Sequence, residues 1–142
     1  MHPLRKLIFD EKLLSSLAET YGTPLYIYSQ ERITENVLNL KNALNKHFEK
    51  FHICYAIKSN SNPHLIKTMR EAFPKIGGDC SSPGEIYAAE LSGIDPSDCI
   101  YTGNYESPSD LKKALTKQCN VNLDDITSLN RIKKIGLPKR IS

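Results

Sequence analysis

The stretch "CYAIKSNSNP", residues 54–63, places a lysine at the end of an apolar run. Active sites of parallel α/β sheets gather at the carboxyl ends of the strands, so Lys58 would project its amine into such an edge. An amine withdrawn from water is held partly as the free base, the form that condenses with an aldehyde. A solvated lysine that protects a strand from aggregation would occupy the same position. The residues alone leave both interpretations open.

The elements that would position Lys58 form a repeating unit from residue 51 onward. Apolar runs at residues 51–58, 74–80, 98–103 and 119–124 predict four strands, and each leads into a helix. Three helices begin with a capping side chain followed by proline, at Asn62, Ser82 and Ser107, and the fourth begins near Asp124. Such a series predicts a parallel sheet whose two faces are both covered.

Glutamate or aspartate three positions after the cap adds a capping box at Ser82 with Glu85 and at Ser107 with Asp110. The final "GLPKRIS" carries a turn signal and the first residues of a fifth strand. A doubly wound sheet and a (β/α)₈ barrel both use this series. No G-x-G-x-x-G or G-x-x-x-x-G-K-[ST] segment supports a nucleotide-binding version of the open sheet.

The first fifty residues do not follow the strand–helix pattern of the rest of the chain. Residues 11–21 predict a helix with Asp10 as N-cap and Gly22 as its stop. "TPLYIY", residues 23–28, predicts a short strand, and residues 29–50 predict an amphipathic helix. The expected buried stripe of that second helix consists of Ile33, Val37, Leu40, Leu44 and Phe48.

Composition excludes several classes of protein. The chain has 142 residues, of which 39% are hydrophobic and 25% charged, with a net charge of +3 and no membrane-length apolar run. The basic cluster Lys133, Lys134, Lys139 and Arg140 has no aromatic companions, so a nucleic-acid partner is not expected. The first residues lack the apolar core of a secretion signal, and Cys54, Cys80, Cys99 and Cys119 form no C-x-x-C pair. We therefore expect a cytoplasmic protein without a metal site.

Five segments, in order, resemble one known family: "YGTPLYIYSQERITENV", "CYAIKSNSNP", "GGDCSSPGEIYAA", "IYTGN" and "VNLDDITSL". They are similar to the amino-terminal part of the pyridoxal-phosphate decarboxylases with an alanine-racemase-like barrel, among which the diaminopimelate decarboxylases look nearest. The resemblance implies that residues 25–142 are the first half of a (β/α)₈ barrel, about four βα units, and that residues 1–24 are a helical lead-in. It also implies that the second half-barrel and a β domain are absent, and that the chain alone is inactive.

The resemblance also implies site residues and partners. Lys58 would form the internal aldimine with pyridoxal 5'-phosphate. The substrate would be a basic or dibasic amino acid such as meso-diaminopimelate, decarboxylated in lysine biosynthesis by a homodimer. Asp79 matches an acidic residue near the cofactor, although a strand-end aspartate is an alternative. Glu85 matches a family position that capping also explains, and Asn60 either contacts the site or shapes the loop after Lys58. Glu106 stands where relatives often have lysine.

Three functional alternatives remain at this point. A racemase would share Lys58, and so would another decarboxylase of basic amino acids. A non-catalytic remnant would bind the cofactor weakly or only associate with partners.

Overall fold

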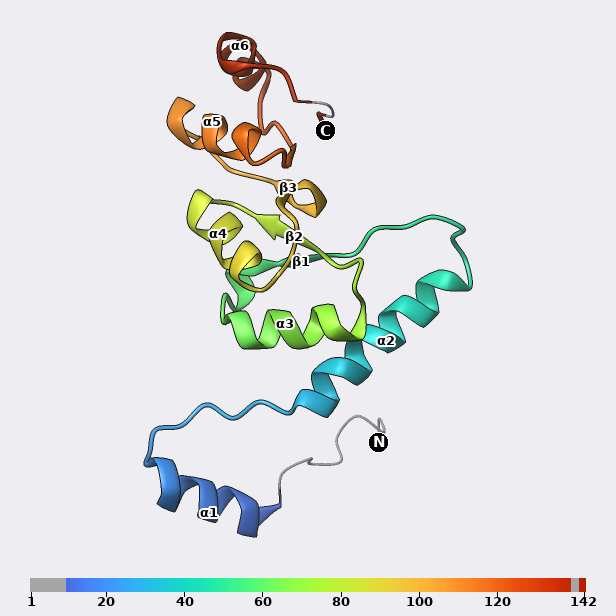
Figure 1. Cartoon of the computed structure of the whole chain (residues 1–142), viewed down its shortest axis with the longest axis vertical. Coiled ribbons are helices and arrows are strands. Elements are labelled where there is room, and N and C mark those ends of the chain that lie inside the picture. Colours follow the sequence, from blue (N-terminus) through green and yellow to red (C-terminus); the bar gives the residue numbers. More distant parts are fainter. Residues whose placement is uncertain (1–9, 139–140) are drawn as a thin grey trace.

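The computed structural model describes residues 10–138 and 141–142. Two helices, α1 (Glu11–Tyr21) and α2 (Gln30–Asn45), precede a series of βα units (Figure 1). The units consist of β1 (Cys54–Ala56), η2 (Ile57–Ser59), α3 (Pro63–Ala72), β2 (Gly77–Cys80), α4 (Pro83–Leu91), η3 (Pro96–Asp98), β3 (Ile100–Tyr101), α5 (Pro108–Thr116), β4 (Asn120–Val121) and α6 (Ile126–Ile135). The residues bearing on a secretion signal, together with Lys139 and Arg140 of the basic cluster, lie outside the described residues.

The four strands form one parallel sheet in the order β1-β2-β3-β4. The register pairs Ala56 with Asp79, and Tyr101 lies between Cys80 and Val121. Ile141 forms a parallel bridge to Val121, which places the residues predicted to begin a fifth strand beside β4. The predicted α/β class and parallel sheet are therefore confirmed, and the strands lie side by side in sequence order.

Side-chain caps begin each of the four helices that follow a strand. The cap residues are Asn62, Ser82, Ser107 and Asp125, and each accepts a backbone N–H from the first turn of its helix. Proline occupies the first turn of α3, α4 and α5, where its missing N–H removes no helical hydrogen bond. The punctuation in the sequence thus fixes where each helix starts.

The two faces of the sheet differ in burial. Alternating residues on one face are buried beneath the helices, and Ala89 of α4 lies against Gly78 on this face. This core includes Ile57, Cys80, Cys99, Tyr101, Cys119 and Val121. Residues on the other face, among them Ala56, Asp79, Thr102 and Asn122, are only half-buried. The prediction that both faces are covered is wrong for the described residues, because the helices that follow the four strands all pack against one face of the sheet.

The region before β1 departs most from expectation. The predicted strand at residues 23–28 is wrong: the segment is irregular, has no paired neighbour, and leaves Tyr26 87% exposed. The second helix ends at Asn45 rather than residue 50, and the predicted buried stripe is half-buried at best, with Leu40 49% and Phe48 56% exposed. Helix α1 begins at its Asp10 cap and stops at Gly22 as predicted, but it buries no residue and stands apart from the sheet (Figure 1).

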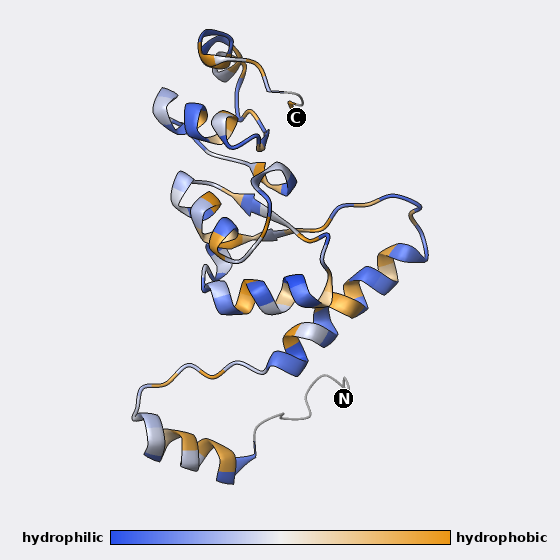
Figure 2. Ribbon diagram, viewed as in Figure 1, coloured by the Kyte–Doolittle hydropathy of each residue, from blue (hydrophilic) through white to orange (hydrophobic). Residues whose placement is uncertain are grey.

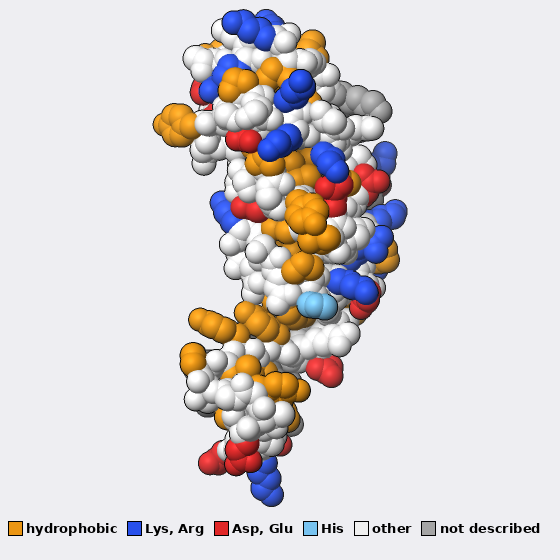
Figure 3. Space-filling view, turned by 60° about the vertical axis from the view of Figure 1, so that its left-hand side comes forward, with side chains coloured by type: hydrophobic (Ala, Val, Ile, Leu, Met, Phe, Trp, Pro, Cys, Tyr) orange, Lys and Arg blue, Asp and Glu red, His pale blue; other side chains and the backbone are white. Residues whose placement is uncertain are grey.

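Apolar residues follow the fold closely from β1 onward. Figure 2 shows hydrophobic stripes on the helices with polar residues between them. One face of the molecule also exposes a line of hydrophobic side chains flanked by charged ones (Figure 3), and Tyr87 and Leu91 of α4 are among the exposed large hydrophobics.

Cys80, Cys99 and Cys119 are buried free thiols. No helix within residues 10–138 and 141–142 has the length and apolarity needed to cross a membrane.

Candidate functional site

Lys58 lies directly after β1, in the single turn of η2, at the edge where α3 and α4 begin. We call this edge, with Lys58, Asn60 and Asp79, the β1–β2 rim. The Lys58 side chain is exposed, and none of the ion pairs among the described residues involves it. The position at the carboxyl end of the strand is as expected. The expected withdrawal from water is not found, because the described chain places nothing over this rim.

Asp79 projects from β2 on the open face, and its backbone pairs with Ala56, two residues before Lys58. One of its carboxylate oxygens accepts a hydrogen bond from the hydroxyl of Thr102, which follows β3. Thr102 lies within the quoted "IYTGN" segment but is not among the predicted site residues. A polar residue directly after an apolar run is the feature of the sequence that could have identified it.

Asn60 organises the loop between β1 and α3. Its side-chain oxygen accepts the N–H of Asn62 at 3.0 Å, and its amide nitrogen donates to the Tyr28 hydroxyl at 3.0 Å. The Tyr55 hydroxyl donates to the Asn60 carbonyl at 3.2 Å. These contacts match the loop-shaping alternative, and they tie the residues before α2 to the segment that carries Lys58.

Glu85 lies in the first turn of α4 and faces back toward the end of β2. Its carboxylate accepts the Ser81 N–H at 2.8 Å and the Ser81 hydroxyl at 3.1 Å, while its own N–H donates to the Ser82 hydroxyl oxygen at 3.3 Å. The predicted box is therefore displaced by one residue, since the carboxylate reaches Ser81 rather than the cap itself. Helix capping occupies this carboxylate, and a contact with a cofactor stays a prediction.

The starts of α3, α4 and α5 offer few free backbone N–H donors. In α3, Pro63 has no N–H, the His64 N–H donates to Asn62, and the next two donate to the Asn62 carbonyl. Caps similarly engage the N–H groups of Glu85 and Asp110. Most of the first-turn N–H groups are therefore engaged, because the residues that cap the helices also accept hydrogen bonds from them.

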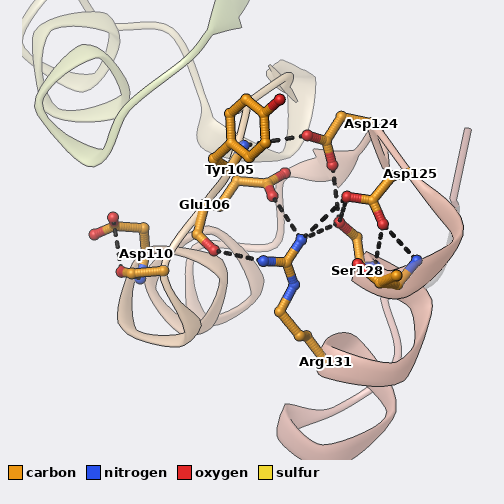
Figure 4. Close-up of polar contacts among 9 residues, drawn as sticks. Tyr105, Glu106, Asp110, Asp124, Asp125, Ser128 and Arg131 are labelled. Atoms are coloured by element: carbon orange, nitrogen blue, oxygen red, sulfur yellow. Dashed lines mark hydrogen bonds and ion pairs between the residues drawn. The ribbon is translucent and has the colours of Figure 1, made fainter.

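A second group of polar side chains lies where β3 and β4 end. We call it the β3–β4 rim: Glu106, Asp124, Asp125, Ser128 and Arg131 (Figure 4). The Arg131 guanidinium lies between the loop after β3 and the start of α6, 3.9 Å from a Glu106 carboxylate oxygen and 3.5 Å from an Asp125 oxygen. It also donates to the Glu106 backbone carbonyl at 3.4 Å.

Burial makes Glu106 unusual within this rim. Its side chain is 1% exposed, and both carboxylate oxygens lack a hydrogen-bond donor within the described residues, leaving the long ion pair to the 32%-exposed Arg131. Burial raises the pKa of Glu106 above its usual range. Asp124 has a lowered pKa because the Tyr105 N–H and the Ser128 hydroxyl donate to it. Hydrogen bonds from the start of α6, led by Thr127, lower the pKa of Asp125.

The donor set of the β1–β2 rim fits the reactive end of pyridoxal phosphate. A primary amine is the group that condenses with an aldehyde, and Lys58 supplies one at the edge typical of such sites. Asp79 adds a carboxylate held by a hydroxyl on the neighbouring strand. The described helix starts fit the phosphate less well, since most of their first-turn N–H groups are already engaged.

Comparison with known proteins identifies the family. Residues 31–141 match the model for "Pyridoxal-dependent decarboxylase, pyridoxal binding domain". Diaminopimelate decarboxylase of Methanothermobacter thermautotrophicus is 38% identical over 120 residues, covering 84% of this chain and 28% of that protein. The Aquifex aeolicus diaminopimelate decarboxylase is 37% identical over 142 residues, covering 96% and 32%.

A solved structure gives the same result. The crystal structure of diaminopimelate decarboxylase from Helicobacter pylori complexed with L-lysine aligns with a TM-score of 0.77 at 32% identity, covering 86% of this chain and 30% of that one. The chain thus spans about a third or less of the length of these relatives. The match over residues 31–141 places the chain in the family of pyridoxal-dependent decarboxylases, as part of their pyridoxal-binding barrel domain.

Proposed function

We propose that this chain is the lysine-bearing part of an amino-acid decarboxylase of the diaminopimelate type, and that Lys58 is the amine that attaches to pyridoxal phosphate. The observation that carries the proposal is the position of Lys58 at the carboxyl end of β1, in a chain that matches the pyridoxal-binding domain over residues 31–141. Asp79 on the adjacent strand is the proposed acidic partner near the attachment point.

The roles of these residues follow from their chemistry. The bound cofactor would supply an electron sink for loss of the substrate carboxylate as CO₂. Lys58 would hold the cofactor covalently until the substrate amine takes its place on the cofactor. Asp79 would stabilise positive charge at the attachment point, while Asn60 would fix the loop that follows Lys58 and Glu85 would fix the backbone that follows β2. The relatives' names support a dibasic substrate such as meso-diaminopimelate and a role in lysine biosynthesis. We also propose that the whole enzyme is a cytoplasmic homodimer.

Covalent trapping tests the proposal directly. We would mix the chain with pyridoxal phosphate, reduce it with borohydride, digest it and locate the added mass. The expected adduct lies on the peptide that contains Lys58. Lys58→Arg abolishes it, since a guanidinium does not condense in this way, whereas Lys67→Arg on exposed α3 leaves it unchanged. An adduct spread evenly over surface lysines, or none at all, would contradict the proposal.

The exposure of Lys58 favours a second candidate, a chain that binds the cofactor weakly and does not catalyse. The engaged helix N–H groups point the same way. Titration with pyridoxal phosphate separates the two candidates. Saturable labelling of Lys58 at micromolar cofactor supports the decarboxylase, and labelling that needs millimolar cofactor supports the weak binder.

A further inference from the structure

Thr102 is held at a fixed place beside Asp79. Its N–H donates to the Cys80 carbonyl at 2.7 Å, which continues the β2–β3 ladder one residue beyond β3. Its hydroxyl donates across the same pair of strands to one oxygen of the Asp79 carboxylate. Both residues lie on the open face, where they are half-buried. A β-branched side chain on a bonded strand has little rotational freedom, so this hydroxyl is a rigid donor.

Asp79 has few other restraints. No ion pair among the described residues includes it, and the only side-chain hydrogen bond to its carboxylate in that part of the chain is the one from Thr102. One oxygen is therefore engaged and the other is left for groups at the β1–β2 rim. The next strand at that rim is β1, whose Ala56 pairs with Asp79 and whose end carries Lys58.

We propose that Thr102 is a positioning residue, which acts through Asp79 on the reactivity of Lys58. This inference rests on the proposed function of Lys58. Attachment begins when the Lys58 ammonium group loses one proton to solvent and the free amine adds to the aldehyde carbon. The aldehyde oxygen then leaves as water with one hydrogen from the nitrogen and one proton from solvent, and the resulting carbon–nitrogen double bond has a nitrogen that keeps one hydrogen and carries a positive charge. A carboxylate fixed nearby stabilises the positive charge on that nitrogen, and a rotating carboxylate does so less well.

Two substitutions separate positioning from packing. Thr102→Val keeps the branched shape and removes the donor, whereas Thr102→Ser keeps the donor. We would measure the rate of borohydride-trapped Lys58 adduct from pH 6 to pH 9 in the full chain, at about one-unit steps. Thr102→Val is expected to slow attachment about three- to tenfold, the range for one lost hydrogen bond, and to change the pH profile. Thr102→Ser is expected to restore both.

A double-mutant cycle tests whether the effect runs through Asp79. Adding Thr102→Val to Asp79→Asn should slow attachment no further than Asp79→Asn alone. Thr116→Val is the matched control, because the Thr116 hydroxyl donates only to the Lys112 carbonyl within α5. Thermal melting of each variant verifies that the fold is retained.

The outcomes are distinct. A Thr102→Val chain that melts like the parent and attaches with the parent's rate and pH profile overturns the inference and leaves the proposed function intact. Additive effects in the cycle also overturn it, since Thr102 would then act independently of Asp79. If Thr102→Val does not fold, Thr102→Ala, which also lacks the hydroxyl, takes its place in the rate measurement and in the cycle. Failure of the parent to label at Lys58 overturns the proposed function and this inference together.

Discussion

The β1–β2 rim and the β3–β4 rim occupy the same edge of one sheet, yet their polar side chains are in opposite situations. At the β1–β2 rim, Lys58 is exposed and without an ion pair among the described residues. At the β3–β4 rim, Arg131 contacts Glu106, Asp125 and Ser128 at once, and Glu106 is buried. The comparison suggests that the first rim keeps its groups available for a ligand, while the second uses them to join a loop to α6.

The largest effect is expected from Arg131→Ala. The substitution leaves the buried Glu106 carboxylate without its counter-charge, so we expect the free energy of unfolding at neutral pH to fall by about 2–3 kcal/mol, below the value for a fully buried pair because Arg131 is one-third exposed. Urea unfolding measures this loss of stability, and Lys134→Ala, at an exposed position of α6, is the control. Equal losses in the two variants would remove the distinction between the rims.

Gly103→Ala tests how tightly the β3–β4 rim is packed. A Cβ at Gly103 would lie 2.4 Å from the Glu106 Cγ, so the buried side chain must move, and we expect a loss of about 2 kcal/mol. Gly84→Ala is the matched control near the other rim, where the nearest atom would be the Ser82 Oγ at 3.8 Å. That control should be neutral or slightly stabilising in thermal melts, because alanine favours the helix.

Glu106→Gln should alter the pH dependence of stability. A raised folded-state pKa means that the folded chain binds the Glu106 proton more tightly than the unfolded chain does. The parent therefore gains stability from this group as pH falls from neutral through the raised pKa. Glu106→Gln lacks that gain, so any stabilisation it gives, about 1 kcal/mol or less at pH 7, should shrink by about pH 4.5. Unfolding curves across pH measure this, and a constant difference would contradict it.

The smallest effect on stability is expected at the β1–β2 rim. Lys58→Ala removes an exposed side chain that has no ion pair in the described part of the chain, so the free energy of unfolding should change by less than about 0.5 kcal/mol. The same variant should lose all covalent trapping. A loss of stability comparable to that of Arg131→Ala would show that Lys58 has a structural role.

The sequence predicted the parts of the fold that depend on local chemistry. The caps Asn62, Ser82 and Ser107 and their prolines set the helix starts, and the apolar runs locate the four strands. Residues 23–28 were predicted wrongly, because β-branched and aromatic residues favour a strand only where a neighbouring strand is present to pair with. The α2 stripe failed for a related reason, since an amphipathic helix becomes buried only against a partner surface.

The candidate site was partly readable for the same reasons. The position of Lys58 follows from the end of a strand, which sequence shows, whereas its exposure depends on what covers the rim, which sequence does not show. The Thr102–Asp79 hydrogen bond and the Glu106–Arg131 pair join residues 23 and 25 positions apart, on neighbouring elements. Strand register brings the first pair together and the packing of α6 against the loop after β3 brings the second together, so neither could be derived from local patterns.

The capped helix starts have a consequence for how an anion would be recognised on this side of the barrel. Proline and cap side chains leave Gly84 and Ser109 among the few first-turn residues of α4 and α5 whose N–H groups are not engaged by a cap. A first-turn N–H group that is already bonded to Asn62, Ser82 or Ser107 is not available to an anion. At this edge of the sheet the exposed Lys58 amine is therefore more accessible to a ligand than the first-turn N–H groups of α3, α4 and α5.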